Sequence, residues 1–115
     1  MYVNINKFVI DALKPIDIPV AFETYIGSES TYITFSEYLE QGESYFDDEE
    51  QATGHYVQVN VFSKGNYSKI VSKVKELLKE VGFIRKTEHG LYEPDTQIYH
   101  RVLRFFFIEE NEEGK

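Results

Sequence analysis

The sequence predicts an α+β fold: a mostly antiparallel or mixed sheet with two helices packed on one face, in the order αββ(loop)βαββ. Three observations predict it. Two segments repeat apolar residues at helical spacing, residues 56–62 alternate apolar and polar side chains, and residues 99–108 are rich in aromatic residues. With 115 residues, the chain has the length of a single domain that can bury its own core.

The first helix is predicted over residues 2–13. Its apolar residues recur every three or four positions and form one stripe: Ile5, Phe8, Val9, Ala12 and Leu13. Pro15 then stops the helix.

Residues 20–25 follow a proline and suit a short edge strand, because proline cannot donate to a central ladder. Residues 31–38 alternate β-branched and aromatic side chains, so we expect them to pair with residues 20–25 as a hairpin.

Residues 40–54 are predicted to form a mobile acidic loop, interrupted by a short strand near residues 44–46. The segment lacks sustained apolar periodicity and carries six acids. Long loops on small domains are usually functional or disordered. Four of the acids form one run: Asp47, Asp48, Glu49 and Glu50. The run lacks the alternating ligands and central glycine of a calcium loop, so we interpret it as a solvated acidic loop.

The clearest strand is predicted over residues 56–62, where three valines at alternate positions face the core. A second helix follows, with Asn66 as its N-cap and Gly82 in the left-handed position at its C-terminal end. Its buried stripe consists of six apolar residues: Ile70, Val71, Val74, Leu77, Leu78 and Val81. Residues 83–88 and 99–108 are predicted as two more strands, joined by a loop around a proline.

The last seven residues, 109–115, are predicted to form a charged flexible tail, so the domain is expected to span residues 1–108.

The predicted sheet has one face that the two helices do not cover. In the last strand, Leu103, Phe105 and Phe107 belong against the helices, yet the alternate residues are also largely apolar: Ile98, His100, Val102, Arg104, Phe106 and Ile108. Exposed aromatic residues and arginine are enriched at protein interfaces. We therefore expect a subunit or partner interface, with five candidate residues: Tyr56, Phe62, His100, Arg104 and Phe106. The alternative is a sheet that curls enough to bury these rings itself.

The net charge of −8 is unevenly distributed along the chain. Residues 15–63 hold ten acids and no lysine or arginine, while residues 64–108 hold nine basic residues against five acids, a net charge of +4. Oppositely charged halves suit either a head-to-tail contact between identical subunits or neutralisation within one molecule. The overall acidity disfavours specific nucleic-acid binding, which needs a basic footprint.

The sequence carries no signal for catalysis, for a metal or for a cofactor. It has no cysteine, and its three histidines lack the spacing of a zinc site. No G-x-G-x-x-G, P-loop or nucleophile elbow is present, so we expect no enzyme activity. The first 15 residues lack the pattern of a secretory signal, and no stretch approaches the roughly 20 apolar residues of a membrane span. Neither secretion nor membrane insertion is expected.

Four segments carry a family resemblance. They are the acidic segment from Tyr45 to Glu50, the strand from Gly54 to Lys64, the helix end at Gly82 and Phe83, and an aromatic C-terminal pattern: Leu91, Tyr92, Glu93, Ile98, Tyr99, His100, Arg104, Phe105, Phe106 and Phe107. Together these segments resemble the tail-completion (tail-terminator) proteins of long-tailed bacteriophages and their prophage relatives. The resemblance spans nearly the whole chain.

The resemblance implies a structural protein that is present in the host cytoplasm during assembly and then in the virion tail. Proteins of that family assemble as a ring, usually a hexamer, on the head-proximal end of the tail tube. There they stop tube polymerisation and provide the surface that joins the tail to the head connector. The implied partners are further copies of the chain, the tail tube protein and a head connector or neck protein. The ring contact would use the uncovered sheet face, and residues 43–53 would meet the tube or line the lumen.

Other readings stay open. Another phage neck protein, such as a head-closure or stopper protein, would show the same features. A small acidic adaptor or DNA-mimicking inhibitor would space carboxylates along one surface, whereas many here cluster in one segment opposite a basic half. A hydrolase would need a concave pocket with coupled carboxylates.

Overall fold

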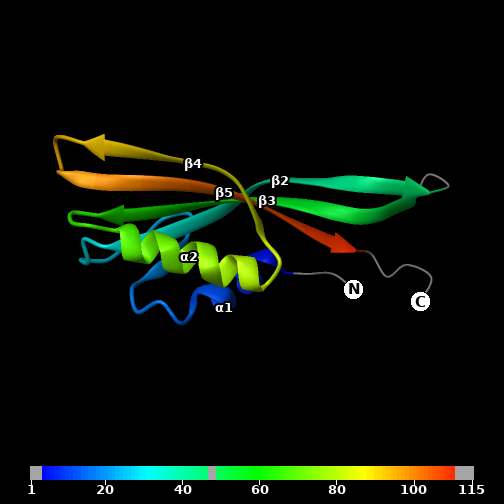
Figure 1. Cartoon of the computed structure of the whole chain (residues 1–115), viewed down its shortest axis with the longest axis horizontal. Helices are drawn as coiled ribbons and strands as arrows, with labels where there is room; N and C mark the ends of the chain where they lie inside the picture. The colour runs from blue at the N-terminus through cyan, green and yellow to red at the C-terminus, as the bar shows by residue number, and fades with distance from the viewer. Residues whose placement is uncertain (1–3, 47–48, 111–115) are drawn as a thin grey trace.

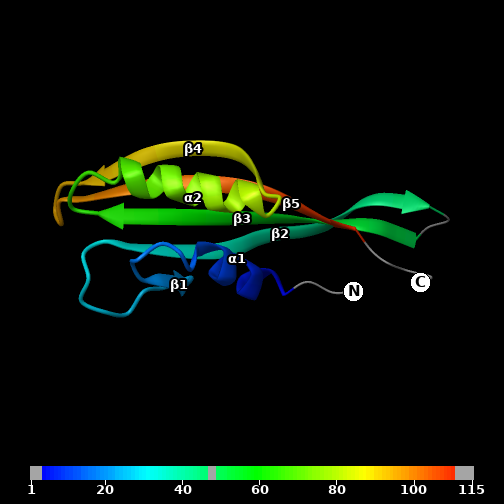
Figure 2. The ribbon, with the colours of Figure 1, turned by 60° about the horizontal axis from the view of Figure 1, so that its bottom comes forward.

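The computed structural model describes the backbone of residues 4–46 and 49–110, and the side chains of those residues outside 41–51. The elements are α1 (Ile5–Leu13), β1 (Val20–Phe22), β2 (Tyr32–Phe46), β3 (Glu49–Ser63), α2 (Ser68–Glu80), β4 (Ile84–Glu93) and β5 (Ile98–Glu110). The five strands form one mixed sheet in the order β1-β2-β3-β5-β4. Both helices lie on the same face of this sheet, α1 over β1 and β2 and α2 over the other strands (Figure 2). The predicted α+β class is confirmed.

The pairing of β1 differs from the prediction. It pairs with β2 in parallel, with Val20 opposite Ile33, so the hairpin expected between these segments is wrong. Glu23 adopts a positive φ of 64° and ends the strand, and its backbone N–H donates to the Phe35 carbonyl at 2.8 Å. The residues after Glu23 carry the chain back along the sheet, so β2 starts beside the beginning of β1. The remaining strand pairs are antiparallel.

Both helices begin close to their predicted starts. The Asn4 side chain accepts the Lys7 backbone N–H at 3.2 Å and caps α1. Residues 2 and 3 of the predicted helix lie outside the described residues. Tyr67, and not Asn66, is the N-cap of α2, although Asn66 Oδ1 accepts the Ser68 backbone N–H at 2.9 Å. The helix ends at Glu80 with Val81 as its C-cap, and Gly82, the next residue, has a φ of +107°, the predicted left-handed conformation.

The core lies between the helices and the sheet. It is built from the predicted stripes of the helices and from alternate residues of β2, β3 and β5, and its fully buried members are Val9, Leu13, Ile33, Phe35, Val57, Val59, Val61, Val74, Leu78, Leu103 and Phe105. Neither helix of the described residues has the length and apolar character that crossing a membrane requires.

The predicted acidic loop is replaced by an extended hairpin. The strands β2 and β3 stay paired through Gly42 opposite Thr53 to Phe46 opposite Glu49, well beyond a β-bulge between Glu37 and Leu39. Figure 1 shows the two strands continuing past the ends of both helices, which makes the molecule 53 Å long and 23 Å wide. We define the extended hairpin as residues 39–46 and 49–56. Asp47 and Asp48 lie outside the described residues.

The C-terminal strands are also longer than predicted. The strand β4 continues through His89 to Glu93, and residues 94–97 form a tight turn into β5. Glu109 and Glu110 belong to β5 and not to a tail, and Glu109 is buried. Residues 111–115 of the predicted tail lie outside the described residues.

Candidate functional site

The open sheet face, the side of the sheet that points away from both helices, gathers the five predicted interface residues. The register opposes them across β3 and β5: Tyr56 with Phe106, Phe62 with His100, and Gln58 with Arg104. Directly opposed residues of an antiparallel pair share a face, so all five lie on one surface. Their role in binding a partner stays a prediction.

Four rings form a continuous stack on this face: Tyr25, Tyr32, Phe62 and His100. Successive ring centroids are 4.5, 4.7 and 4.2 Å apart, and the rings are inclined to one another by 26°, 23° and 24°. Aromatic pairs at such separations contribute about 0.5–1.5 kcal/mol each beyond the area that they bury. The stack therefore holds these rings in one arrangement.

A second aromatic group lies beside the extended hairpin. The ring centroid of Tyr56 is 4.9 Å from that of Phe106 and 6.1 Å from that of Tyr38. Arg104 lies over the Tyr38 ring at 5.2 Å, and Lys86 lies over the Phe106 ring at 5.9 Å. Cation–π contacts of this kind stabilise exposed sites by about 0.5–1 kcal/mol each.

A row of hydrogen bonds separates the two aromatic groups. Arg104 Nε donates to Gln58 Oε1 at 3.0 Å, and Asn60 Nδ2 donates to Thr34 Oγ1 at 3.2 Å. Asn60 Oδ1 accepts from Gln58 Nε2 at 2.9 Å and from His100 Nε2 at 3.1 Å. His100 therefore carries its proton on Nε2. Burial lowers the pKa of His100, because the charged imidazolium loses hydration there.

The rings cover this face only in part. The side chains of Tyr56, Phe62, His100 and Phe106 are half-buried, and Arg104 is exposed. Around them several large apolar side chains are open to solvent: Tyr38, Leu39, Leu91 and Ile108. An apolar surface of this extent, rimmed by polar groups, is typical of a protein interaction site.

The strand order places the acidic and the basic half of the sequence on different sides of the molecule. The strands β1, β2 and β3 of the acidic half form one side of the sheet, while β5, β4 and the covering helix α2 belong to the basic half. Among the ion pairs of the described residues, none joins an acid of residues 15–63 to a lysine or arginine of residues 64–108. Within the described residues, the acidic and the basic half are therefore not joined by direct ion pairs.

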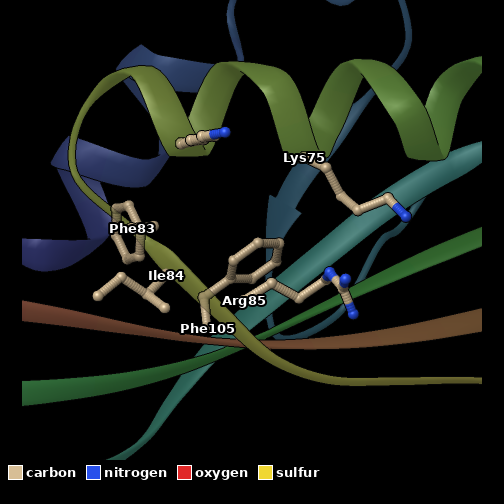
Figure 3. Close-up of a pocket in the computed structure, with 6 residues that line it drawn as sticks. Lys75, Phe83, Ile84, Arg85 and Phe105 are labelled. Atoms are coloured by element: carbon tan, nitrogen blue, oxygen red, sulfur yellow. The ribbon is translucent and has the colours of Figure 1, made fainter.

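A hollow of about 310 Å³ opens on the helix side, between the end of α2 and the start of β4. Phe83, Ile84 and Phe105 form its apolar lining, and three cations surround it: Lys75, Lys79 and Arg85. Figure 3 shows the Phe105 ring beneath the helix, with Lys75 and Arg85 extending to the same side. The six residues that line it include no carboxylate.

The sequence analysis missed a buried charged cluster on the helix side. His55 is 1% exposed; its Nδ1 lies 2.5 Å from Glu37 Oε2 and its Nε2 lies 2.9 Å from Glu109 Oε1. Burial lowers the pKa of His55, but the hydrogen bonds to Glu109 and Glu37 outweigh it, so the pKa is raised. The only sequence signal was a histidine at a core-facing position of an alternating strand.

No protein-family model matches the chain, and no curated protein matches it in sequence. Among solved structures, a chain from the virion of a native gene transfer agent (GTA) particle superposes with a TM-score of 0.59, covering 90% of this chain and 92% of that chain. The two proteins share one fold. Another solved structure, of a protein without a stated function, superposes with a TM-score of 0.60 over 96% of this chain and 93% of its own. Both are 12% identical to this chain, so the likeness establishes the fold alone.

Proposed function

We propose that this chain is a structural component of a phage-like virion, and that it caps the head-proximal end of the tail tube. In that position it ends tube polymerisation and forms the surface that joins the tail to the head. The observation that carries the proposal is the fold that it shares, over nine-tenths of its length, with a chain from the virion of a gene transfer agent. The resemblance of its sequence segments to tail-completion proteins supports the same role, which requires no catalytic group.

The proposed ring forms through a head-to-tail contact that includes the open sheet face. Tyr56, Phe62 and Phe106 supply apolar surface, and Arg104 is exposed and held in place by Gln58. A head-to-tail contact joins two different patches, and it closes into a ring when the rotation between subunits allows. The acidic side of one subunit and the basic side of the next favour this arrangement over a symmetric pairing of like charges.

The extended hairpin is the proposed contact with the tube or the lining of the lumen. It extends beyond both helices, and the run from Asp47 to Glu50 comprises the two residues between β2 and β3 and the first two residues of β3. Negative charge at a lumen would repel DNA that passes through and would not bind it. If tails assemble normally after Asp47 to Glu50 are replaced by serine and glycine, this assignment loses its support.

Two measurements test the proposed role. Light scattering coupled to size exclusion, over a wide concentration range and with added salt, should detect a salt-sensitive oligomer, with a hexamer expected. In the second measurement, a substoichiometric amount of this protein is added to polymerising tail tube protein from the same genome. The tubes should become shorter, and the protein should appear at one end of each tube in electron micrographs. Tubes of unchanged length would overturn the capping role. Binding to the head connector without any effect on tubes would instead favour a head-closure or stopper protein.

A further inference from the structure

Three potential metal ligands converge on the helix side of the sheet, at the base of the extended hairpin. One ligand atom each from Glu37, Glu40 and His55 can be chosen so that all three lie within 4.8 Å of one another. Residues three apart on a regular strand point to opposite faces. The bulge between Glu37 and Leu39 adds one residue, so Glu37 pairs with Val57 and Glu40 with His55, on the same face.

The orientation of the His55 ring suits metal binding. Its Nε2 lies 2.9 Å from Glu109 Oε1 on β5, and its Nδ1 points toward the carboxylates of β2. Histidines that bind metals usually donate their other ring N–H to a carboxylate, which fixes the tautomer and the ring orientation. Glu109 is 7% exposed and can fulfil that role.

The charge of the cluster also favours a cation. Three carboxylates surround one imidazole: those of Glu37, Glu40 and Glu109. Even a protonated His55 leaves an excess of negative charge. In the described part of the chain, no lysine or arginine forms an ion pair with Glu37 or Glu40. A divalent cation would neutralise this excess at a partly buried position.

We propose that Glu37, Glu40 and His55 bind a divalent transition metal of the zinc type, with Glu109 as the residue that positions His55. One imidazole nitrogen and carboxylate oxygens, without a thiolate, form a ligand set that zinc accepts, and the remaining coordination position is left to water. Ligand atoms of a tetrahedral zinc site lie about 3.3 Å apart, so the 2.5 Å contact between Glu37 and His55 has to open slightly. Glu40 is exposed and provides both the entry path and the mobile ligand.

The bound ion would clamp the extended hairpin to the core. Its ligands come from β2 and β3, and Glu109 links the same site to the end of β5. The clamp would thus join three strands at the point where the helices no longer cover the sheet. This inference goes beyond the proposed function and does not depend on it.

The test is a metal titration of the full chain after treatment with a chelator. Zinc chloride is titrated by calorimetry, and Co²⁺ is followed by visible absorption as a probe of nitrogen and oxygen ligation. We expect one ion per chain, a dissociation constant in the micromolar range and a raised melting temperature. Glu40→Gln should weaken binding by about tenfold or more. It should leave the fold of the metal-free chain intact, because Glu40 is exposed and lies outside the hydrogen-bonded Glu37–His55–Glu109 group.

The matched control is His89→Gln. His89 lies near His100 on the other side of the sheet and offers the alternative histidine pair for adventitious binding. This variant should keep the affinity of the wild-type chain. Absence of saturable binding up to about 1 mM zinc would overturn the proposal. It would also be overturned if Glu40→Gln bound zinc as well as the wild-type chain, or if His89→Gln abolished binding.

Discussion

Two histidines of neighbouring strands have opposite environments. The imidazole of His55 is enclosed by carboxylates, which raise its pKa despite burial. His100 is half-buried between Phe62 and the neutral Asn60, and its pKa is lowered. Folding therefore favours the protonated form of the first and the neutral form of the second. Their contributions to stability change with pH in opposite directions.

His100→Gln should remove one component of this pH dependence. The unfolded chain binds a proton at His100 with a pKa near 6.5, and the folded chain binds it at a lower pH. As pH falls from about 7.5 to about 5.5, the unfolded state takes up more protons at this site, so the wild-type chain loses stability relative to the variant. Urea unfolding of both proteins across this range measures the difference, in which the contribution of His55 cancels. A difference that is constant with pH would contradict the prediction.

The Glu88 carboxylate accepts hydrogen bonds from two cations, Lys75 at 3.0 Å and Arg101 at 2.8 and 2.6 Å, and lies 3.5 Å from Arg85. Burial raises the pKa of Glu88, but the hydrogen bonds from Lys75 and Arg101 outweigh it, and the pKa is lowered. Glu88→Gln should therefore lower the free energy of unfolding by about 1–3 kcal/mol at neutral pH.

The loss should shrink in acid. A lowered pKa stabilises the folded state above the ordinary value of 4.5, and this stability is lost as pH falls through the folded pKa. Urea unfolding at neutral and acidic pH measures both values. The control is Glu76→Gln, which removes an exposed ion pair with Lys73 and should cost less than about 1 kcal/mol. Equal losses for the two variants would show that the Glu88 network adds nothing beyond a surface pair.

At the scale of an element, α2 depends on the glycine that ends it. Gly82 has a φ of +107°, and an added Cβ would lie 3.2 Å from the Phe107 ring. Gly82→Ala should destabilise the protein by about 1–2 kcal/mol in chemical denaturation. Gly65→Ala is the control, since Gly65 has no such φ and no atom within 4 Å of the added Cβ. The prediction fails if both variants unfold at the same denaturant concentration.

The extended hairpin should be separable from the core. Replacing residues 43–52 by Asn-Gly joins Gly42 to Thr53, which are paired in the sheet, through a favoured two-residue turn. The fully buried core residues all lie outside the replaced segment, so the free energy of unfolding should change by less than about 1 kcal/mol. Tube capping should be lost. Unfolding at a much lower denaturant concentration would show instead that the hairpin stabilises the core.

Hydrophobic patterns predicted the elements that pack against the core. They failed for strand segments that lack such a pattern and are paired by main-chain hydrogen bonds. The stripes of α1 and α2 and the alternation of residues 56–62 were read correctly, because burial imposes a period on them. Residues 40–54 carry acids and glycine without a period, yet residues 40–46 and 49–54 belong to paired strands, which main-chain hydrogen bonds hold together. The direction of β1 could not be predicted either, since a three-residue strand looks the same in a parallel and an antiparallel pair.

At the scale of the whole molecule, the proposed ring contact can be tested by charge reversal. Arg104→Glu should weaken self-association by about tenfold or more without unfolding the chain, because Arg104 is exposed and the expected partner surface is acidic. Lys69→Glu, on the helix side, changes the charge equally and is the control. Light scattering at several concentrations measures both variants. If Arg104→Glu associates like the control, the open sheet face is not the contact.

The open sheet face and the cluster around His55 differ in how far sequence could predict them. The members of the open sheet face belong to alternating strands, so their common face follows from the period of two. The cluster around His55 required the exact pairing of β2 with β3, including the bulge after Glu37, and the continuation of β5 to Glu109. A one-residue shift in register would have sent these side chains to opposite faces.

The stacked rings also give the molecule an optical signal of its own. The chain has nine tyrosines and no tryptophan, so its near-ultraviolet spectrum comes mainly from tyrosine. Tyr25 and Tyr32 stack at 4.5 Å on the open sheet face, and near-ultraviolet circular dichroism depends on such fixed ring packing. A subunit or partner that docks on this face would alter that spectrum, and association could be followed without attaching a dye.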